Sequence, residues 1–462
     1  MGETLVKDKQ TSMIRDLTTG PIARTLVAFA LPMLLANLLQ TVYNMVDMVV
    51  IGQFVGSAGL AAVSIGTDII QLPTYFAIGF CSAAQVLIAQ YVGAGDTDSI
   101  KRTIGTMFTF LLLTAIAIST VCVIGTDTFL NLMNTPEDSF VLARVYSLTC
   151  YAGLFFTFGY LMVSSILRGM GDSRHPLIFI AVAASINLVL DLLFVAVFGM
   201  GTFGAALATV IGQAISFIAS IVYLFRHREA FGFDFKPRSF IMDKSILKKL
   251  VKLGIPVSMQ NVTIVFSVLF VNSYINAYGV VAAAVTGIGL KLSLVTTIIS
   301  SSFSTGGAAM IGQCLGAGKA ERVPRIMGFS MVVNLACAVF LGSLTILLPK
   351  QIFGLFNTDP AVLDMAMVFL PCAVMSYFGF AVRSPLFALI YGIGHAPLNL
   401  IVALLDGIVG RIVLALFMGI AIGMGVQGFW YGNVLAGYIP LLVIGPYYLS
   451  GKWRTYKLPI LR

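Results

Sequence analysis

Charged residues are scarce in this chain. They make up 10% of its 462 residues, and 58% of the residues are hydrophobic, whereas ordinary globular domains carry about 25% charged residues. A soluble body of this length needs more charge to cover its surface, and a disordered chain would combine low hydrophobicity with high net charge. These shortages exclude both classes and indicate a polytopic membrane protein.

Cysteine and histidine are also few. The six cysteines fall within or at the edge of apolar segments and form no CxxC pair, which argues against a disulfide framework or a metal knuckle. The three histidines, His175, His227 and His395, lie between the apolar segments, and no HExxH, GxSxG or paired DxxxD motif occurs. We therefore expect neither an enzyme nor a bound cofactor.

Twelve apolar segments are long enough to cross a bilayer as helices, which takes about 20 residues each. They are continuous apolar runs joined by short glycine-rich turns, which favours helices over a barrel, whose strands alternate over about 10 residues. The fold class predicted is all-α, with spans near 27–50, 63–90, 104–126, 141–166, 177–198, 204–224, 254–278, 283–312, 326–349, 363–388, 397–420 and 425–449.

The net charge of +9 is spread over short runs between these spans, so it predicts topology and no nucleic-acid partner. Of the 28 lysines and arginines, 23 fall in loops and tails on one side, and only Arg144 and Lys350 fall in loops on the other. Because cytoplasmic loops are enriched in lysine and arginine, we expect a multi-pass protein of the plasma (inner) membrane with both termini cytoplasmic.

The two halves of the chain repeat each other. YVGAGDTDSIKRTIG at 91–105 matches CLGAGKAERVPRIMG at 314–328 without a gap, an offset of 223 residues. Six spans per half give two lobes of the same orientation, related by a pseudo-two-fold axis along the membrane normal, with a substrate path expected at their interface. The predicted parts are a tail at 1–25, an N-lobe at 26–224, a linker at 225–252, a C-lobe at 253–449 and a tail at 450–462.

Several motifs together resemble one family. They are LP…QTVYNMVD at 31–47, the two GAG turns, RGMGD at 168–172, NLVLD at 187–191, GTFGAALAT at 201–209 and GMGVQGFWYG at 423–432. The chain resembles the multidrug and toxic-compound extrusion (MATE) family over essentially its full length, and its bacterial members most closely. The resemblance implies two six-helix lobes around a V-shaped cleft and antiport: export of small, often cationic amphipathic compounds in exchange for protons or sodium.

Two acidic residues, Asp47 and Asp191, lie inside predicted spans of the N-lobe at similar depth. Tyr43 and Asn187 precede them by four residues and so share their helix faces, and Thr209 lies at a matching depth in the sixth span. Two close carboxylates require a cation or a shared proton, and neutral oxygens around them suit hard cations. We predict a coupling site for a proton, or for Na⁺ at Asp47, Asn187, Asp191 and Thr209.

The resemblance implies the same five residues as the cation or proton site, and it implies Pro32 as the bend of the first helix. The alternative for Asp191 is a hydrogen bond to neighbouring helices only. The C-lobe departs from the family members that carry acidic residues there, because its first span has none and its fourth has none beyond Asp364. Coupling is therefore expected in the N-lobe.

Other charges in the spans lead to structural expectations. Asp68 and Lys291 occupy equivalent places in the repeat, which predicts either a gate pair across the cleft or, for each residue, a partner or water inside its own lobe. Asp406 and Arg411 are expected to form a structural pair. Arg383 either hydrogen-bonds carbonyl groups near the inner end of its span or, as the simpler account, snorkels to the interface.

We expect small-molecule substrates, a lipid surround and a monomer. The nearest rival function is a lipid-linked precursor flippase of the same superfamily, and export of an endogenous metabolite is a further alternative.

Overall fold

The fold is almost wholly helical in the computed structural model, which describes residues 15–461. Within that range no strand occurs, and twelve helices are long and apolar enough to cross a membrane. The predicted all-α, twelve-span fold is therefore confirmed. Residues 1–14 of the predicted N-terminal tail, and Arg462 of the C-terminal tail, lie outside the described residues.

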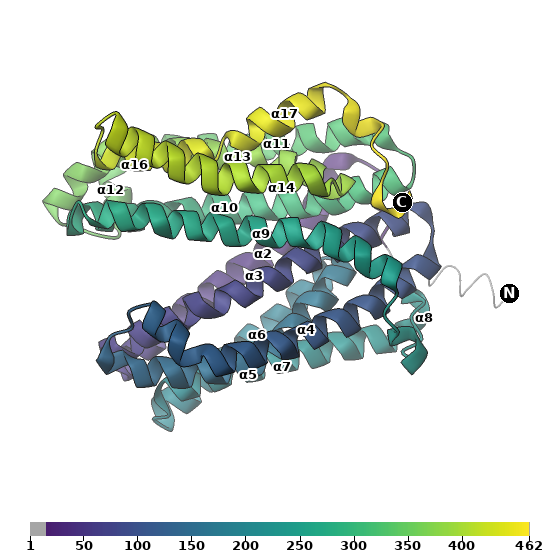
Figure 1. The fold of residues 1–462 in the computed structure, drawn as a ribbon, viewed down its shortest axis with the longest axis horizontal. Coiled ribbons are helices and arrows are strands. Elements are labelled where there is room, and N and C mark those ends of the chain that lie inside the picture. The colour runs from purple at the N-terminus through teal and green to yellow at the C-terminus, as the bar shows by residue number, and fades with distance from the viewer. Residues whose placement is uncertain (1–14, 462) are drawn as a thin grey trace. The chain divides into compact units, whose positions relative to one another are not determined.

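Figure 1 labels the helices. The first six spans are α2 (Ile22–Phe54), α3 (Gly56–Ala94), α4 (Thr97–Leu132), α5 (Glu137–Gly169), α6 (Arg174–Asp191) with η1 (Leu192–Val197), and α7 (Gly201–Arg226). The segment that follows holds α8 (Arg228–Phe231) and η2 (Pro237–Phe240).

The remaining spans begin with α9 (Lys244–Asn276), α10 (Val280–Gly316), η3 (Ala320–Arg322) with α11 (Val323–Leu347), and α13 (Pro360–Ile393). The eleventh is a run of α14 (Ala396–Leu404), η4 (Leu405–Val413), α15 (Leu414–Leu416) and η5 (Phe417–Ala421). The twelfth is α16 (Val426–Ala436) and α17 (Ile439–Leu449); the short elements are α12 (Pro349–Gly354), η6 (Lys452–Arg454) and η7 (Pro459–Leu461).

Two details differ from the sequence expectation. Several helices extend beyond their apolar windows, as α3 does at Gly56–Ala94 against the expected 63–90, because a helix continues past the hydrocarbon boundary wherever its residues still favour helix. The twelfth span is broken between α16 and α17. Pro440 lies in the first turn of α17, where a proline is tolerated but would disrupt a continuous helix.

The chain forms two compact units. Unit 1 contains residues up to Asp16 and Leu31–Val251, and unit 2 contains Leu17–Ala30 and Lys252–Arg462. The start of α2 thus belongs to unit 2, while the first turns of α9 belong to unit 1. Each of these two helices carries a proline within five residues after the change of unit, Pro32 in α2 and Pro256 in α9.

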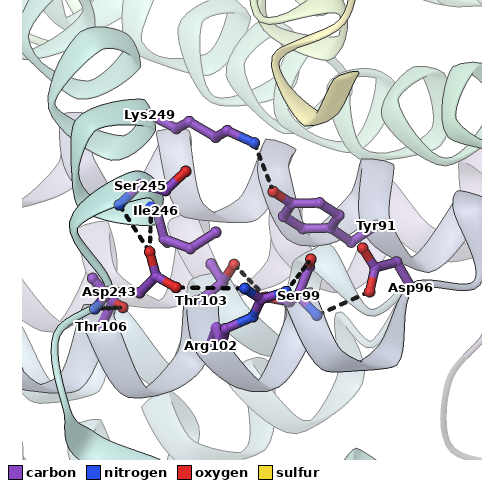
Figure 2. A network of polar contacts seen from close by, with 10 residues as sticks. All are labelled: Tyr91, Asp96, Ser99, Arg102, Thr103, Thr106, Asp243, Ser245, Ile246 and Lys249. Carbon is purple, nitrogen blue, oxygen red and sulfur yellow. Dashed lines mark hydrogen bonds and ion pairs between the residues drawn. The ribbon is translucent and has the colours of Figure 1, made fainter. Parts of the chain in front are cut away.

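A polar network fixes the start of α9 within unit 1 (Figure 2). The Asp243 amide donates to Thr106 Oγ1 at 3.0 Å, and the Asp243 carboxylate accepts from the amides of Ser245 and Ile246. Arg102 pairs with the same carboxylate at 3.6 Å. Asp243 therefore caps the helix and joins it to α4.

The sequence repeat is also a repeat of packing. A Cβ on Gly169 of α5 would lie 2.8 Å from the Gln85 carbonyl oxygen and 2.9 Å from Ile88 Cβ. A Cβ on Gly392 of α13 would meet Ala308 and Ile311, the residues 223 positions after Gln85 and Ile88. Each unit therefore crosses its second and fourth spans at the same close, glycine-dependent contact.

The glycine-rich turns repeat in the same way. The last glycines of the two GAG sequences, Gly95 and Gly318, have φ of 71° and 73°. This left-handed backbone is one that glycine adopts without steric cost. The two units therefore share the turn geometry that the repeated GAG motif indicated.

Candidate functional site

The five predicted coupling residues come from three helices of unit 1. Asp47 of α2 and Asn187 and Asp191 of α6 are buried, with 7%, 3% and 1% of their surfaces exposed. Tyr43 of α2 and Thr209 of α7 are half-buried. Ionisable side chains buried in a membrane span are costly and mark functional positions.

The structure brings the two carboxyl groups together. The side chains of Asp47 and Asp191 lie within hydrogen-bonding reach of each other. Two carboxylates can share a hydrogen bond only if one of them carries a proton. Asp47 Oδ1 and Asp191 Oδ1 are buried, and neither accepts a hydrogen bond from a donor of the described residues.

Asn187 joins Asp191 to α7. With its amide nitrogen turned toward Asp191, it donates to Asp191 Oδ2 at 2.9 Å, and its oxygen accepts from the Thr209 backbone amide at 3.2 Å. The Tyr43 side chain lies near Asp47 and Asp191 and within hydrogen-bonding reach of Thr209. The five residues therefore form one connected polar cluster.

Local backbone features place this cluster. Asp191 is the last residue of α6, and the π-helical turn η1 follows it directly; such turns are frequent at functional sites. Gly212 lets α7 approach α6, because a Cβ there would lie 3.1 Å from the Ala183 carbonyl oxygen and 3.4 Å from Asn187 Cβ. The helix that carries Thr209 can thus reach Asn187.

Two residues of α5 that sequence reasoning missed lie beside this cluster. Tyr146 and Cys150 are buried and within electrostatic reach of Asp47. They are four residues apart and so share one helix face, but neither side chain is charged at neutral pH, so neither has the signature of an ionised group inside an apolar span. They form part of the apolar wall around the site, with Val50, Ile51, Val63, Val195, Ala205 and Ala206.

The cluster suits a proton or a hard monovalent cation. Residues 15–461 contain no group of three or more His, Cys, Asp or Glu side chains that would hold a metal ion. A cation bound at this cluster would have as ligands the two carboxylates and the neutral oxygens of Asn187 and Thr209. Oxygen donors of these kinds are the ligands that hard cations prefer. The two unpartnered carboxyl oxygens are the acceptors available to it.

The other predicted site residues lie apart from the cluster. Pro32 is inside α2, close to the change of unit, and lacks the amide that would complete the helical ladder there. Asp68 on α3 and Lys291 on α10 are each exposed on their own unit. The gate pair stays a prediction.

Unit 2 contains a charge cluster that the sequence indicated only in part. Asp406, with none of its surface exposed, bonds Arg411 at 3.3 Å as expected and also bonds Arg383 at 3.1 Å. The expectation that Arg383 snorkels is wrong, since only 13% of its side chain is exposed. The carboxylate of Asp406 holds it inside the helical bundle, where the electrostatic attraction exceeds that in water.

Comparisons with known proteins agree on one family. A family model described as MatE matches residues 32–193 and again residues 256–417. The chain is 28% identical over 430 residues to the probable multidrug resistance protein YoeA of Bacillus subtilis, covering 92% of this chain and 93% of that protein. It is also 28% identical to the probable multidrug resistance protein YpnP of the same organism, covering 96% and 98%.

A solved structure has the same fold. It is described as the outward-facing conformation of a multidrug resistance MATE family transporter of the MOP superfamily. It superimposes with a TM-score of 0.87 at 20% identity, covering 95% of this chain and 98% of that one. At 20% sequence identity this likeness shows a shared fold and nothing further.

Proposed function

The chain belongs to the MatE family of multidrug efflux transporters, and we propose that it is a secondary antiporter. It exports small, often cationic amphipathic compounds and takes up protons or sodium ions by alternating access of its two units. The buried carboxyl pair Asp47–Asp191 is the observation that carries this proposal, because such a pair binds a cation or an additional proton reversibly. We place it in the plasma membrane, with both termini cytoplasmic.

The coupling cycle follows from the chemistry of the pair. With one shared proton the pair carries a single negative charge. A proton arriving from outside neutralises it, whereas a sodium ion displaces the shared proton and binds to both carboxylates and to the oxygens of Asn187 and Thr209. On the inward path the proton or ion leaves toward the cytoplasm.

Binding of either a proton or a sodium ion changes the charge and the hydrogen bonding of Asp47 in α2. Pro32 gives that helix a position where its backbone hydrogen bonds are already incomplete. Substrate and coupling ion then stabilise different arrangements of unit 1. Differential binding of this kind is sufficient to couple the two fluxes.

Everted membrane vesicles that contain the protein test this proposal directly. A fluorescent cationic dye is loaded from the bath, and transport into the vesicles is driven by a proton gradient alone or by a sodium gradient alone. We expect transport with at least one gradient and loss of it in the Asp47→Asn variant. Transport that needs neither gradient, or that continues unchanged in the variant, would contradict antiport through this site.

A further inference from the structure

The charge cluster of unit 2 links three spans. Arg383 of α13 donates to Asp406 Oδ2, and Arg411 donates to Asp406 Oδ1 from within the same π-helical stretch η4. Arg411 also donates from its NH1 to Asn433 Oδ1 of α16 at 2.8 Å. Asp406 and Arg411 are more than nine-tenths buried.

The charges in this cluster do not balance. Two guanidinium groups share a single carboxylate, which leaves one positive charge in surroundings where an isolated ion is costly. Residues 252–462 contain only four acidic side chains, Glu321, Asp359, Asp364 and Asp406. Asp364, which is exposed and lies on the same helix as Arg383, is 19 residues away from it, or about 28 Å along the axis.

One donor of the cluster has no acceptor. Arg411 Nε is buried and has no hydrogen-bond partner among the described residues. A buried donor of a charged group that is left without an acceptor destabilises the folded protein. The cluster of Arg383, Asp406 and Arg411 therefore lacks one hydrogen-bond acceptor as well as one balancing negative charge.

The packing around the two arginines holds them in place. Arg383 lies over the rings of Phe387 and Phe380, with its guanidinium carbon 4.9 and 5.8 Å from their centroids. Gly407 and Gly410 bring η4 close to its neighbours, because a Cβ on them would lie 2.4 Å from the Thr263 side chain and 2.1 Å from that of Ile439. The guanidinium groups thus have little freedom to turn toward water.

We propose that Arg383 and Arg411 bind an anion, a carboxylate group or a halide ion, which shares the guanidinium donors with Asp406. A guanidinium group offers five N–H donors in a planar fork that matches such acceptors. The anion supplies both the missing negative charge and the missing acceptor. This site is separate from the cation-coupling pair of unit 1, and its occupation does not depend on a transport cycle.

A purely structural cluster predicts different behaviour. In that case Asp406 alone satisfies the arginines, added anions leave the stability of the protein unchanged, and replacing Asp406 only destabilises it. If the two arginines bind an anion, Asp406 competes with that anion for the N–H donors of Arg383 and Arg411. Replacing it with the neutral, equally shaped asparagine then strengthens anion binding.

The experiment measures thermal unfolding of the full-length protein in detergent, as the fraction that remains monodisperse after heating. Chloride or benzoate is titrated against potassium isethionate at constant ionic strength. A ligand of the folded state raises the unfolding temperature, and above the dissociation constant the rise continues with the logarithm of the ligand concentration. We expect such a rise in the wild type, and a dissociation constant about tenfold lower in Asp406→Asn when the rise is fitted, a gain of ~1.4 kcal/mol in binding.

The arginine variants and one control complete the test. Arg411→Gln and Arg383→Gln should lose the anion-dependent shift, whereas Lys350→Gln, which removes an exposed positive charge in the short helix α12, should retain it. A rise of the unfolding temperature with chloride alone assigns the site to an inorganic ion, and tighter binding of benzoate assigns it to the carboxylate of an organic solute. No anion-dependent shift in the wild type and in Asp406→Asn, weaker binding in Asp406→Asn, or an unchanged shift in both arginine variants would overturn the proposal.

Discussion

A Cβ atom on Gly105 of α4 would lie 1.7 Å from the carbonyl oxygen of Ser239 in the segment before α9. The segment packs this tightly on α4 because Phe233 and Phe240 contact Phe108 at ring-centroid distances of 6.2 and 5.6 Å. The equivalent glycine of the second half, Gly328 of α11, has open space at the same position. The two repeat-equivalent positions therefore differ: Gly105 has no room for a side chain, whereas Gly328 has.

We expect Gly105→Ala to lower stability by about 1–3 kcal/mol, the usual cost of forcing an atom into a packed contact. The matched Gly328→Ala should be neutral or slightly stabilising, because alanine favours helix over glycine by up to about 1 kcal/mol. Thermal unfolding of both variants in detergent measures the difference. Equal effects of the two substitutions would show that the segment does not hold its place on α4.

The coupling pair predicts the effect of two isosteric substitutions. Asp47→Asn and Asp191→Asn each remove the titrating charge but preserve shape, so each should reduce gradient-driven efflux at least tenfold while the protein still elutes as a folded species. Asp127→Asn, which removes an exposed carboxylate paired with Arg144, is the control and should transport normally. Full efflux by the double Asp47→Asn, Asp191→Asn variant would place coupling elsewhere.

Topology can be tested at exposed positions. Lys236, with 76% of its side chain exposed, lies in the segment between the halves, and Asp138 is exposed at the start of α5. In a background without the six native cysteines, Lys236→Cys should react with an impermeant thiol reagent only from the cytoplasmic side and Asp138→Cys only from outside. The charge distribution predicts this result, and the reverse labelling of either position would contradict it.

Asp96 predicts a dependence of stability on pH. It caps α4 by accepting from the Ser99 amide at 3.0 Å, and hydrogen bonds from the Ser99 side chain and backbone hold the pKa of Asp96 below its ordinary value. The folded protein therefore binds fewer protons than the unfolded chain near pH 4, and the stabilisation present at neutral pH is lost as pH falls below that value.

The comparison uses Asp96→Asn, which retains a capping side chain, and Asp96→Ala, which should cost about 1 kcal/mol at pH 7. The stability difference between the wild type and Asp96→Asn should shrink as pH is lowered from 7 to 3, as followed by thermal unfolding. A difference that stays constant over this range would exclude the ionised cap.

The sequence alone was sufficient to predict the fold class and to indicate much of the candidate site. Long apolar runs require helices because backbone groups in lipid must bond within their own segment, and the 223-residue offset predicted two units with equivalent turns, as Gly95 and Gly318 show. Asp47 and Asp191 were recognisable because a carboxyl group inside an apolar run is rare. Their equal depth followed from counting residues along straight helices.

Only the tertiary structure decided which polar groups meet. It joined Arg383 to Asp406, placed Tyr146 and Cys150 beside Asp47, and assigned the start of α2 to unit 2 and the start of α9 to unit 1. These relationships depend on how helices are rotated and how closely they pack. Rotation and separation are set by side-chain fit between segments distant in sequence, and hydrophobic runs in membrane spans carry little periodic signal of which face turns inward.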